Sequence, residues 1–124
     1  MSKILIVEDD PSIQALLHDF IREAGYSVAL AADGVEALAK FSEQVFDLVL
    51  LDIMLPKIDG YGVLEVIRQK SDVPVIMLTA LDGEENQIRG LDLQADDYIT
   101  KPFSMPVLLR KIAAVLRRSS KQSH

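Results

Sequence analysis

The sequence predicts an α/β domain built on a doubly wound parallel sheet. Short, strongly apolar runs at residues 4–7, 48–51 and 75–78 have the composition of strands that are buried on both faces. Segments in which apolar residues recur at helical spacing separate these runs, and this alternation is typical of repeated strand–helix units. The 124 residues are enough for one such domain with a substantial core.

The first strand–helix unit carries clear boundary signals. Asp10 and Pro11 follow the strand at residues 4–7, and they suit the N-cap and the first turn of a helix. The helix is expected to stop at Gly25, because glycine readily adopts the left-handed conformation that ends helices. Its predicted inner face holds five apolar residues at helical spacing: Ile13, Leu16, Leu17, Phe20 and Ile21.

The other elements follow in alternation. Further strands are expected at residues 27–31, 48–51, 75–78 and 98–99, and further helices after Asp33-Gly34 and at residues 60–69, 84–92 and 104–118. The helix after Gly34 is predicted to turn Val35, Leu38 and Ala39 inward. The last helix is predicted to turn four residues inward: Leu108, Ile112, Val115 and Leu116.

Five such units with right-handed crossovers favour the flavodoxin-like (βα)5 arrangement, with strand order 2-1-3-4-5. Ligands of open α/β sheets bind at the carboxyl ends of the strands, so polar residues that follow separate strands can meet in one site. Carboxylates that lie close together repel unless a cation lies among them, and oxygen ligands suit magnesium. The residues that would meet are Glu8, Asp9, Asp10, Asp52, Thr79 and Lys101.

These residues also have ordinary structural interpretations. The acidic run at residues 8–10 could be a solvated helix start, where the helix dipole favours negative charge. Thr79 could be a simple β-branched strand residue, and Lys101-Pro102 could be only a turn, although an X-Pro bond at such a place can be cis. Asp52 is harder to explain in this way, because it lies between apolar residues and a carboxylate there needs a partner.

Composition excludes several classes of protein. The absence of cysteine excludes a disulfide scaffold and thiolate metal sites. The apolar runs are too short to cross a bilayer, and the acidic run interrupts any signal-peptide pattern, so we expect a soluble cytoplasmic protein that does not enter the membrane. A net charge of −6 argues against broad contact of this chain alone with nucleic acid.

The order and spacing of these motifs resemble the receiver domain of two-component response regulators. The resemblance rests on Glu8-Asp9-Asp10, Asp52, Thr79-Ala80 and Lys101-Pro102, and it extends from Lys3 to about Arg118. Residues 55–60 (LPKIDG) and 95–103 (ADDYITKPF) further resemble the OmpR/PhoB winged-helix class of transcription factors.

The resemblance implies a phosphoryl-transfer site. Asp52 would take a phosphoryl group from a phosphohistidine on a partner sensor histidine kinase. Asp9, Asp52 and the backbone carbonyl of Met54 would hold Mg²⁺, and Glu8 would reach the ion through water. The phosphoryl oxygens would be bound by three further groups: Lys101, the Thr79 hydroxyl and the Ala80 amide.

The resemblance also implies a switch and a dimer. Thr79 would move toward the phosphoryl group, Tyr98 would rotate inward, and a homodimer would form on phosphorylation. In the dimer, Asp96 would pair with Lys111 and Asp97 with Arg118. Arg89 matches the family pattern as well, but its expected acidic partner falls at Val107, so the dimer should be weaker than in relatives.

The expected organisation is a receiver domain at residues 1–118 and a polar tail, or the start of a linker, at residues 119–124. DNA would be bound only through a winged-helix module that follows in such proteins. Two alternatives stay open at this point. One is a flavodoxin-like cofactor binder, which residues 8–10 disfavour because carboxylates repel a phosphate, and the other is a receiver-fold interaction domain that is not phosphorylated.

Overall fold

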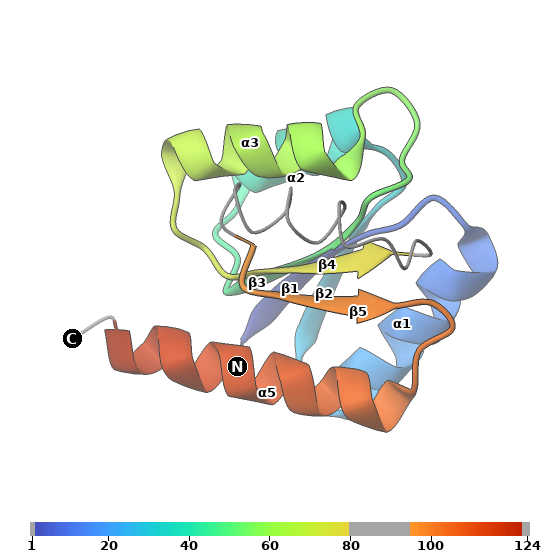
Figure 1. The fold of residues 1–124 in the computed structure, drawn as a ribbon, viewed down its shortest axis with the longest axis vertical. Coiled ribbons are helices and arrows are strands. Elements are labelled where there is room, and N and C mark those ends of the chain that lie inside the picture. The colour runs from blue at the N-terminus through green and yellow to red at the C-terminus, as the bar shows by residue number, and fades with distance from the viewer. Residues whose placement is uncertain (1, 80–94, 123–124) are drawn as a thin grey trace.

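Five parallel strands form one sheet in the order β2-β1-β3-β4-β5, so the predicted fold class and strand order are confirmed (Figure 1). The computed structural model describes residues 2–79 and 95–122, with side chains described as far as Ser119. The helix predicted at residues 84–92 lies outside the described residues. The strands are β1 (Lys3–Val7), β2 (Ser27–Ala31), β3 (Leu48–Asp52), β4 (Val75–Thr79) and β5 (Asp97–Thr100), and the described helices are α1 (Pro11–Glu23), α2 (Gly34–Glu43), α3 (Gly60–Lys70) and α5 (Met105–Gln122).

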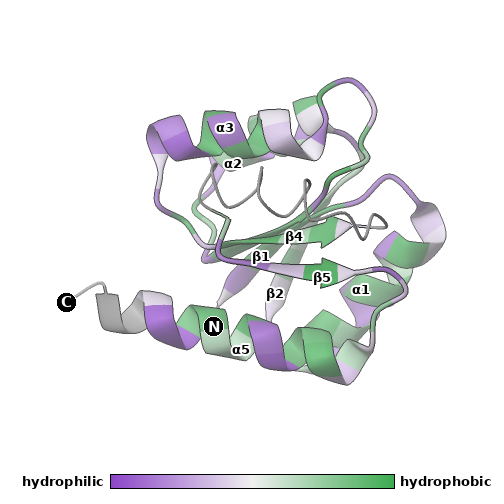
Figure 2. Cartoon of the chain, in the orientation of Figure 1, coloured by the Kyte–Doolittle hydropathy of each residue, from purple (hydrophilic) through white to green (hydrophobic). Residues whose placement is uncertain are grey.

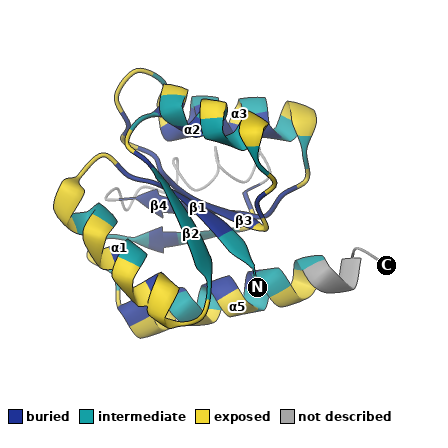
Figure 3. Ribbon diagram, turned by 180° about the vertical axis from the view of Figure 1, so that it is seen from behind, coloured by how far each residue is buried: buried dark blue, intermediate teal, exposed yellow. Residues whose placement is uncertain are grey.

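Two apolar clusters fill the space between the sheet and its helical layers. Helices α2 and α3 cover one face of the sheet, and α1 and α5 cover the other (Figure 1). Every residue of β3 and β4 is buried, and Figure 3 shows this contrast between the buried strands and the exposed outer faces of the helices. Hydropathy follows the same division, with hydrophobic residues along β4 and an alternation around α5 (Figure 2). Packing on both faces holds the ends of the central strands in place.

The inner face of α1 is narrower than the sequence predicted. Leu17 and Ile21 are fully buried, whereas Leu16 and Phe20 are 44% and 43% exposed. The predicted apolar stripe spans about 140° at 100° per residue. The sheet covers only the side of this stripe that is centred on Leu17 and Ile21, so the other side faces outward.

The inner face predicted for α2 is confirmed only for Leu38, which packs against the apolar cluster on this side of the sheet. Val35 is 49% exposed and Ala39 is also exposed, whereas Gly34 and Ala37 are buried. A Cβ atom at residue 34 would lie 2.4 Å from the backbone oxygen of Ile58, so only glycine permits this approach of the loop before α3. The helix therefore buries the small residues Gly34 and Ala37 beside Leu38, and the apolar pattern alone did not indicate these two.

Both predicted ends of α1 are confirmed. Asp10 is the N-cap, and its Oδ1 accepts hydrogen bonds from the backbone N–H of Ser12 at 2.8 Å and of Ile13 at 3.3 Å. Pro11 occupies the first turn, and Gly25 follows the helix with a φ of 104°, a conformation that glycine adopts without strain.

Helix α5 continues beyond the boundary that the sequence predicted. It extends through Gln122, so residues 119–122, expected as a polar tail, are helical. These residues include no helix breaker, and cations near a helix C-terminus are favoured by the dipole. Within the described part of the chain, no helix combines the length and the apolar character that a membrane span requires.

Candidate functional site

Three of the four acids predicted to meet, Glu8, Asp9 and Asp52, do so at the carboxyl ends of β1 and β3, whereas the Asp10 side chain caps α1. These strands are paired in register, with Val7 opposite Leu51, so Glu8 and Asp52 leave the sheet side by side. Glu8 is 1% exposed and Asp52 is 2% exposed, whereas Asp9 is exposed. One carboxylate oxygen from each of the three residues lies within 4.8 Å of the others.

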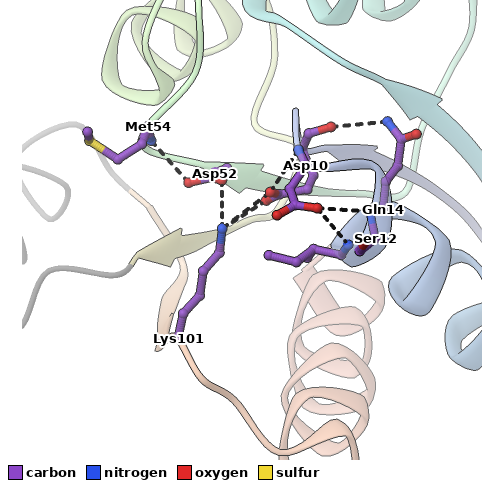
Figure 4. Close-up of polar contacts among 8 residues, drawn as sticks. Asp10, Ser12, Gln14, Asp52, Met54 and Lys101 are labelled. Carbon is purple, nitrogen blue, oxygen red and sulfur yellow. Dashed lines mark hydrogen bonds and ion pairs between the residues drawn. The ribbon is translucent and has the colours of Figure 1, made fainter.

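Lys101 supplies the cation among these acids. Its Nζ lies 2.8 Å from Asp52 Oδ2 and 3.1 Å from Glu8 Oε2, and it reaches both from the loop after β5 (Figure 4). The Lys101-Pro102 peptide bond is cis, as the sequence allowed. Residues distant in sequence thus form a compact, charged site beside the buried sheet.

Burial and charge change the acidity of this cluster. The pKa of Glu8 is raised to about 7, and burial is the largest cause. The neighbouring Asp52 raises this pKa further, by more than Lys101 lowers it. For Lys101, burial lowers the pKa, but hydrogen bonds to Asp52 and Glu8 outweigh it, so the net pKa is raised and the side chain stays cationic. One cation among three carboxylates leaves the site with surplus negative charge.

The loop after β3 shapes the approach to Asp52. The Met54 backbone N–H donates to Asp52 Oδ1 at 3.0 Å, while the Met54 side chain is 61% exposed. A Cβ atom at Gly60 would lie 2.3 Å from the Asp52 backbone oxygen, so α3 can begin against this strand end only with glycine there. The sequence motif at residues 55–60 contained Gly60 but did not indicate this contact.

Thr79 lies at the end of β4, next to β3, the strand that ends in Asp52. It is 1% exposed, and its backbone oxygen accepts a hydrogen bond from the Lys101 N–H at 2.6 Å. Ala80, which was predicted to contribute an amide, lies outside the described residues.

The arrangement fits a hard divalent cation. Its donors are carboxylate oxygens, two of them on buried residues, and no sulfur or imidazole ligand belongs to the acidic cluster among the described residues. Magnesium prefers such oxygen donors and keeps several waters, which the exposed side at Asp9 would admit.

The residues predicted for the dimer face pair differently within the chain. Within one chain Asp97 pairs with Lys111 at 3.1 Å, and the pairs expected between two copies in the dimer stay predictions. Asp96 instead accepts from Arg68 Nη2 at 3.0 Å and from the Val75 backbone N–H at 2.8 Å. No sequence pattern pointed to Arg68, because it lies on a helix far from residue 96 in the chain.

The structure also places two further residues that the sequence predicted, Arg118 of the dimer face and Tyr98 of the switch. Arg118 lines a cavity of about 100 Å³ together with Asp96. Tyr98 is half-buried and packs against the apolar cluster on the side of α2 and α3. Arg89 lies outside the described residues.

Residues 4–113 match the family model described as the response regulator receiver domain. This match covers most of the chain, and the acidic cluster with its lysine lies at the site that the sequence motifs indicated. The chain therefore belongs to the response regulator receiver domain family, and the predicted membership is confirmed.

The curated relatives are regulators of about twice the length. The chain is 53% identical over 119 residues to the probable transcriptional regulator ycf27 of Guillardia theta, an alignment that covers 96% of this chain and 47% of the relative. It is 50% identical over 117 residues to regulatory protein VanRB of Enterococcus faecalis, covering 94% of this chain and 53% of that protein. The chain thus spans about half the length of these relatives.

Solved structures share the whole fold. The receiver domain of the Francisella response regulator 1452 superimposes with a TM-score of 0.92 at 37% identity, covering 96% of this chain and 99% of that chain. A CheY-like response regulator receiver domain protein from Methanospirillum hungatei gives a TM-score of 0.94 at 36% identity, covering 98% of both chains.

Proposed function

We propose that Asp52 is the phosphoacceptor of this receiver domain and that its phosphoryl donor is a phosphohistidine on a partner sensor histidine kinase. The observation that carries the proposal is the buried Asp52 carboxylate, held 2.8 Å from Lys101 Nζ within a cluster of acids. A carboxylate oxygen of Asp52 attacks phosphorus, the P–N bond breaks, and its electron pair stays on the histidine ring nitrogen. The product is an aspartyl phosphate.

Lys101 and Thr79 would stabilise the transferred group. Lys101 already lies beside the attacking carboxylate, so its ammonium can contact a phosphoryl oxygen as charge develops. Thr79, at the end of the adjacent strand, would donate its hydroxyl to another oxygen. The Ala80 amide is proposed as a further donor from the resemblance alone.

Magnesium is the proposed cofactor. Asp9, Asp52 and the Met54 backbone carbonyl would hold it, with Glu8 reaching it through water. When bound, the ion offsets the charge of the acids and of the phosphoryl oxygens. The support for this set is the close approach of the carboxylate oxygens of Glu8, Asp9 and Asp52.

A mass measurement tests the phosphoacceptor. After incubation with acetyl phosphate and magnesium, the wild-type chain should gain the mass of one phosphoryl group, and Asp52→Asn should gain none, because an amide is not a nucleophile here. Asp72→Asn is the matched control, since Asp72 is exposed before β4 at the opposite end of the sheet. A phosphorylated Asp52→Asn variant would refute the assignment, and a wild-type chain that stays unmodified would favour an interaction domain that is not phosphorylated.

We further propose that phosphorylation switches the face that the helix predicted at residues 84–92 would form with β5 and α5, and that it promotes homodimerisation. Thr79 and Tyr98 would shift, and Lys111, now paired with Asp97 in its own chain, would exchange partners with a second copy. The remaining residues proposed for this face are Asp96, Arg118 and Arg89. In the whole protein, the dimer would control transcription through a DNA-binding domain.

Sedimentation of the chain with and without a beryllofluoride phosphoryl mimic tests the dimer. The mimic should promote association of the wild-type chain, and Asp97→Asn should reduce it, whereas Glu43→Gln, at an exposed position on α2 on the other side of the sheet from α5, should not. A dimer that forms equally well in Asp97→Asn would place the interface elsewhere.

A further inference from the structure

The geometry points to Gln14 as a positioning residue for Asp9, and this inference rests on the proposed magnesium site. Gln14 Nε2 donates a hydrogen bond of 3.0 Å to the backbone oxygen of Glu8 (Figure 4). That oxygen belongs to the peptide plane that joins Glu8 to Asp9. Because the peptide unit is planar, fixing its oxygen restricts the direction in which the Asp9 backbone and side chain leave it.

Asp9 needs such support more than its neighbours do. Lys101 holds the carboxylates of Glu8 and Asp52 directly. The Asp9 side chain is exposed, and it forms no hydrogen bond or ion pair with any other described residue. The backbone therefore decides which positions the Asp9 carboxylate can reach relative to the other two acids, and Gln14 is the side chain that anchors the preceding peptide from α1.

The anchor itself is rigid. Gln14 lies in the first turns of α1, where its backbone N–H donates to the Asp10 oxygen at 2.9 Å and Asp10 caps the helix. On the other side, the Glu8 N–H donates to the Ala31 oxygen of β2 at 3.0 Å. The Glu8 backbone is thus held on both sides. The sheet binds its N–H, in the peptide with Val7, and α1 binds its carbonyl oxygen, in the peptide with Asp9, through the Gln14 amide.

Replacing Gln14 by methionine removes the donor and keeps the length and the helix propensity of the side chain. The magnesium dissociation constant of Gln14→Met, measured by calorimetry, should rise roughly threefold to tenfold, as expected for losing one ordinary hydrogen bond. Because this bond exists without the ion, the thermal midpoint of the metal-free protein should fall below that of Gln69→Met only by what one ordinary hydrogen bond explains, and the added effect on magnesium arises because the freed peptide must be ordered again when the ion binds. Gln69 is the matched control, since it is exposed on α3. At saturating magnesium, the rate of phosphorylation by acetyl phosphate should stay within about twofold of wild type.

The outcomes separate this inference from the proposed function. If the wild-type chain binds no magnesium, the proposed site fails and the positioning role fails with it. If wild type binds magnesium and Gln14→Met binds it equally well, only the positioning role is overturned. A metal-free thermal midpoint that falls further below that of Gln69→Met than the loss of one hydrogen bond explains would also overturn it, because Gln14 would then support the fold in general and not the direction of Asp9.

Discussion

The two ends of the sheet carry the same kinds of charged side chain but balance them differently. In the acidic cluster at the carboxyl end, Lys101 is the one cation among the described residues, between the almost fully buried Glu8 and Asp52, and Asp9 adds a third carboxylate nearby. The negative charge there exceeds the positive charge. Such an imbalance in a buried place is costly, and a ligand of positive charge would relieve it.

At the amino end of β5 the charges are matched. Asp96 pairs with Arg68, and Asp97 pairs with Lys111. Arg68 also donates to the Val73 backbone oxygen at 2.6 Å, so this contact ties α3 to the segments before β4 and β5. The contrast indicates that matched ion pairs stabilise the fold, whereas a surplus of charge of one sign marks a site for a ligand of the opposite charge.

The largest effect is expected from Lys101→Met. Removing the cation leaves two buried carboxylates facing each other, so the metal-free free energy of unfolding should fall by about 3 kcal/mol. Millimolar magnesium should restore much of this loss, because it replaces the missing positive charge. Denaturant unfolding with and without magnesium measures both effects. Lys57→Met is the control, since Lys57 is 62% exposed at the same end of the sheet, and its change should be much smaller. A Lys101→Met variant as stable as wild type would contradict the proposed difference between the two ends of the sheet.

Arg68→Met tests the matched end. The Arg68 side chain is 13% exposed and bonds to Asp96 and to a backbone oxygen, so its loss should cost about 2 kcal/mol in the free energy of unfolding. Magnesium should not restore this loss, because removing Arg68 does not add uncompensated negative charge to the proposed magnesium site. If magnesium restored the stability of Arg68→Met as much as that of Lys101→Met, the two ends of the sheet would not differ in their response to a cation.

Lys111→Met should have a smaller effect on stability. Lys111 and Asp97 are each 31% exposed, so solvent screens their pairing, and the free energy of unfolding should change by less than about 1 kcal/mol. If this face forms the proposed dimer, the same variant should weaken association in the presence of beryllofluoride. If Lys111→Met lost more than about 1 kcal/mol of stability and associated like wild type, the Lys111–Asp97 pair would support the fold and not the dimer.

The smallest effect concerns pH and Asp33, the N-cap of α2. The hydrogen bond from the Glu36 backbone N–H, and then the contact with Lys57, lower the pKa of Asp33 below its ordinary 3.8. The folded state therefore holds this proton less tightly than the unfolded state, so the contribution is present above pH 3.8 and is lost as pH falls through the folded-state pKa. Asp33→Asn keeps an oxygen acceptor, so its thermal midpoint should fall less than that of wild type over this acidic range. Parallel curves for the two proteins would contradict the prediction.

Local sequence patterns predicted most of the fold because local physics decides most of it. The apolar runs of β3 and β4 could only be buried strands, and the Asp10-Pro11 start and Gly25 end of α1 follow from backbone preferences. The inner faces of α1 and α2 were less predictable. An apolar stripe does not specify which of its edges the sheet will cover, and for this reason Leu16 and Phe20 are exposed.

The sequence by itself determined the class of fold, the family and the residues of the acidic site, because each of these depends on residue types at fixed positions along the chain. Only the tertiary structure decided how those residues are joined. It placed Lys101 between Glu8 and Asp52, and it paired Asp96 with Arg68. The physical reason is that a hydrogen bond or ion pair depends on separations of about 3 Å. Such separations between distant segments are set only when the sheet, its twist and the helices on both faces pack together.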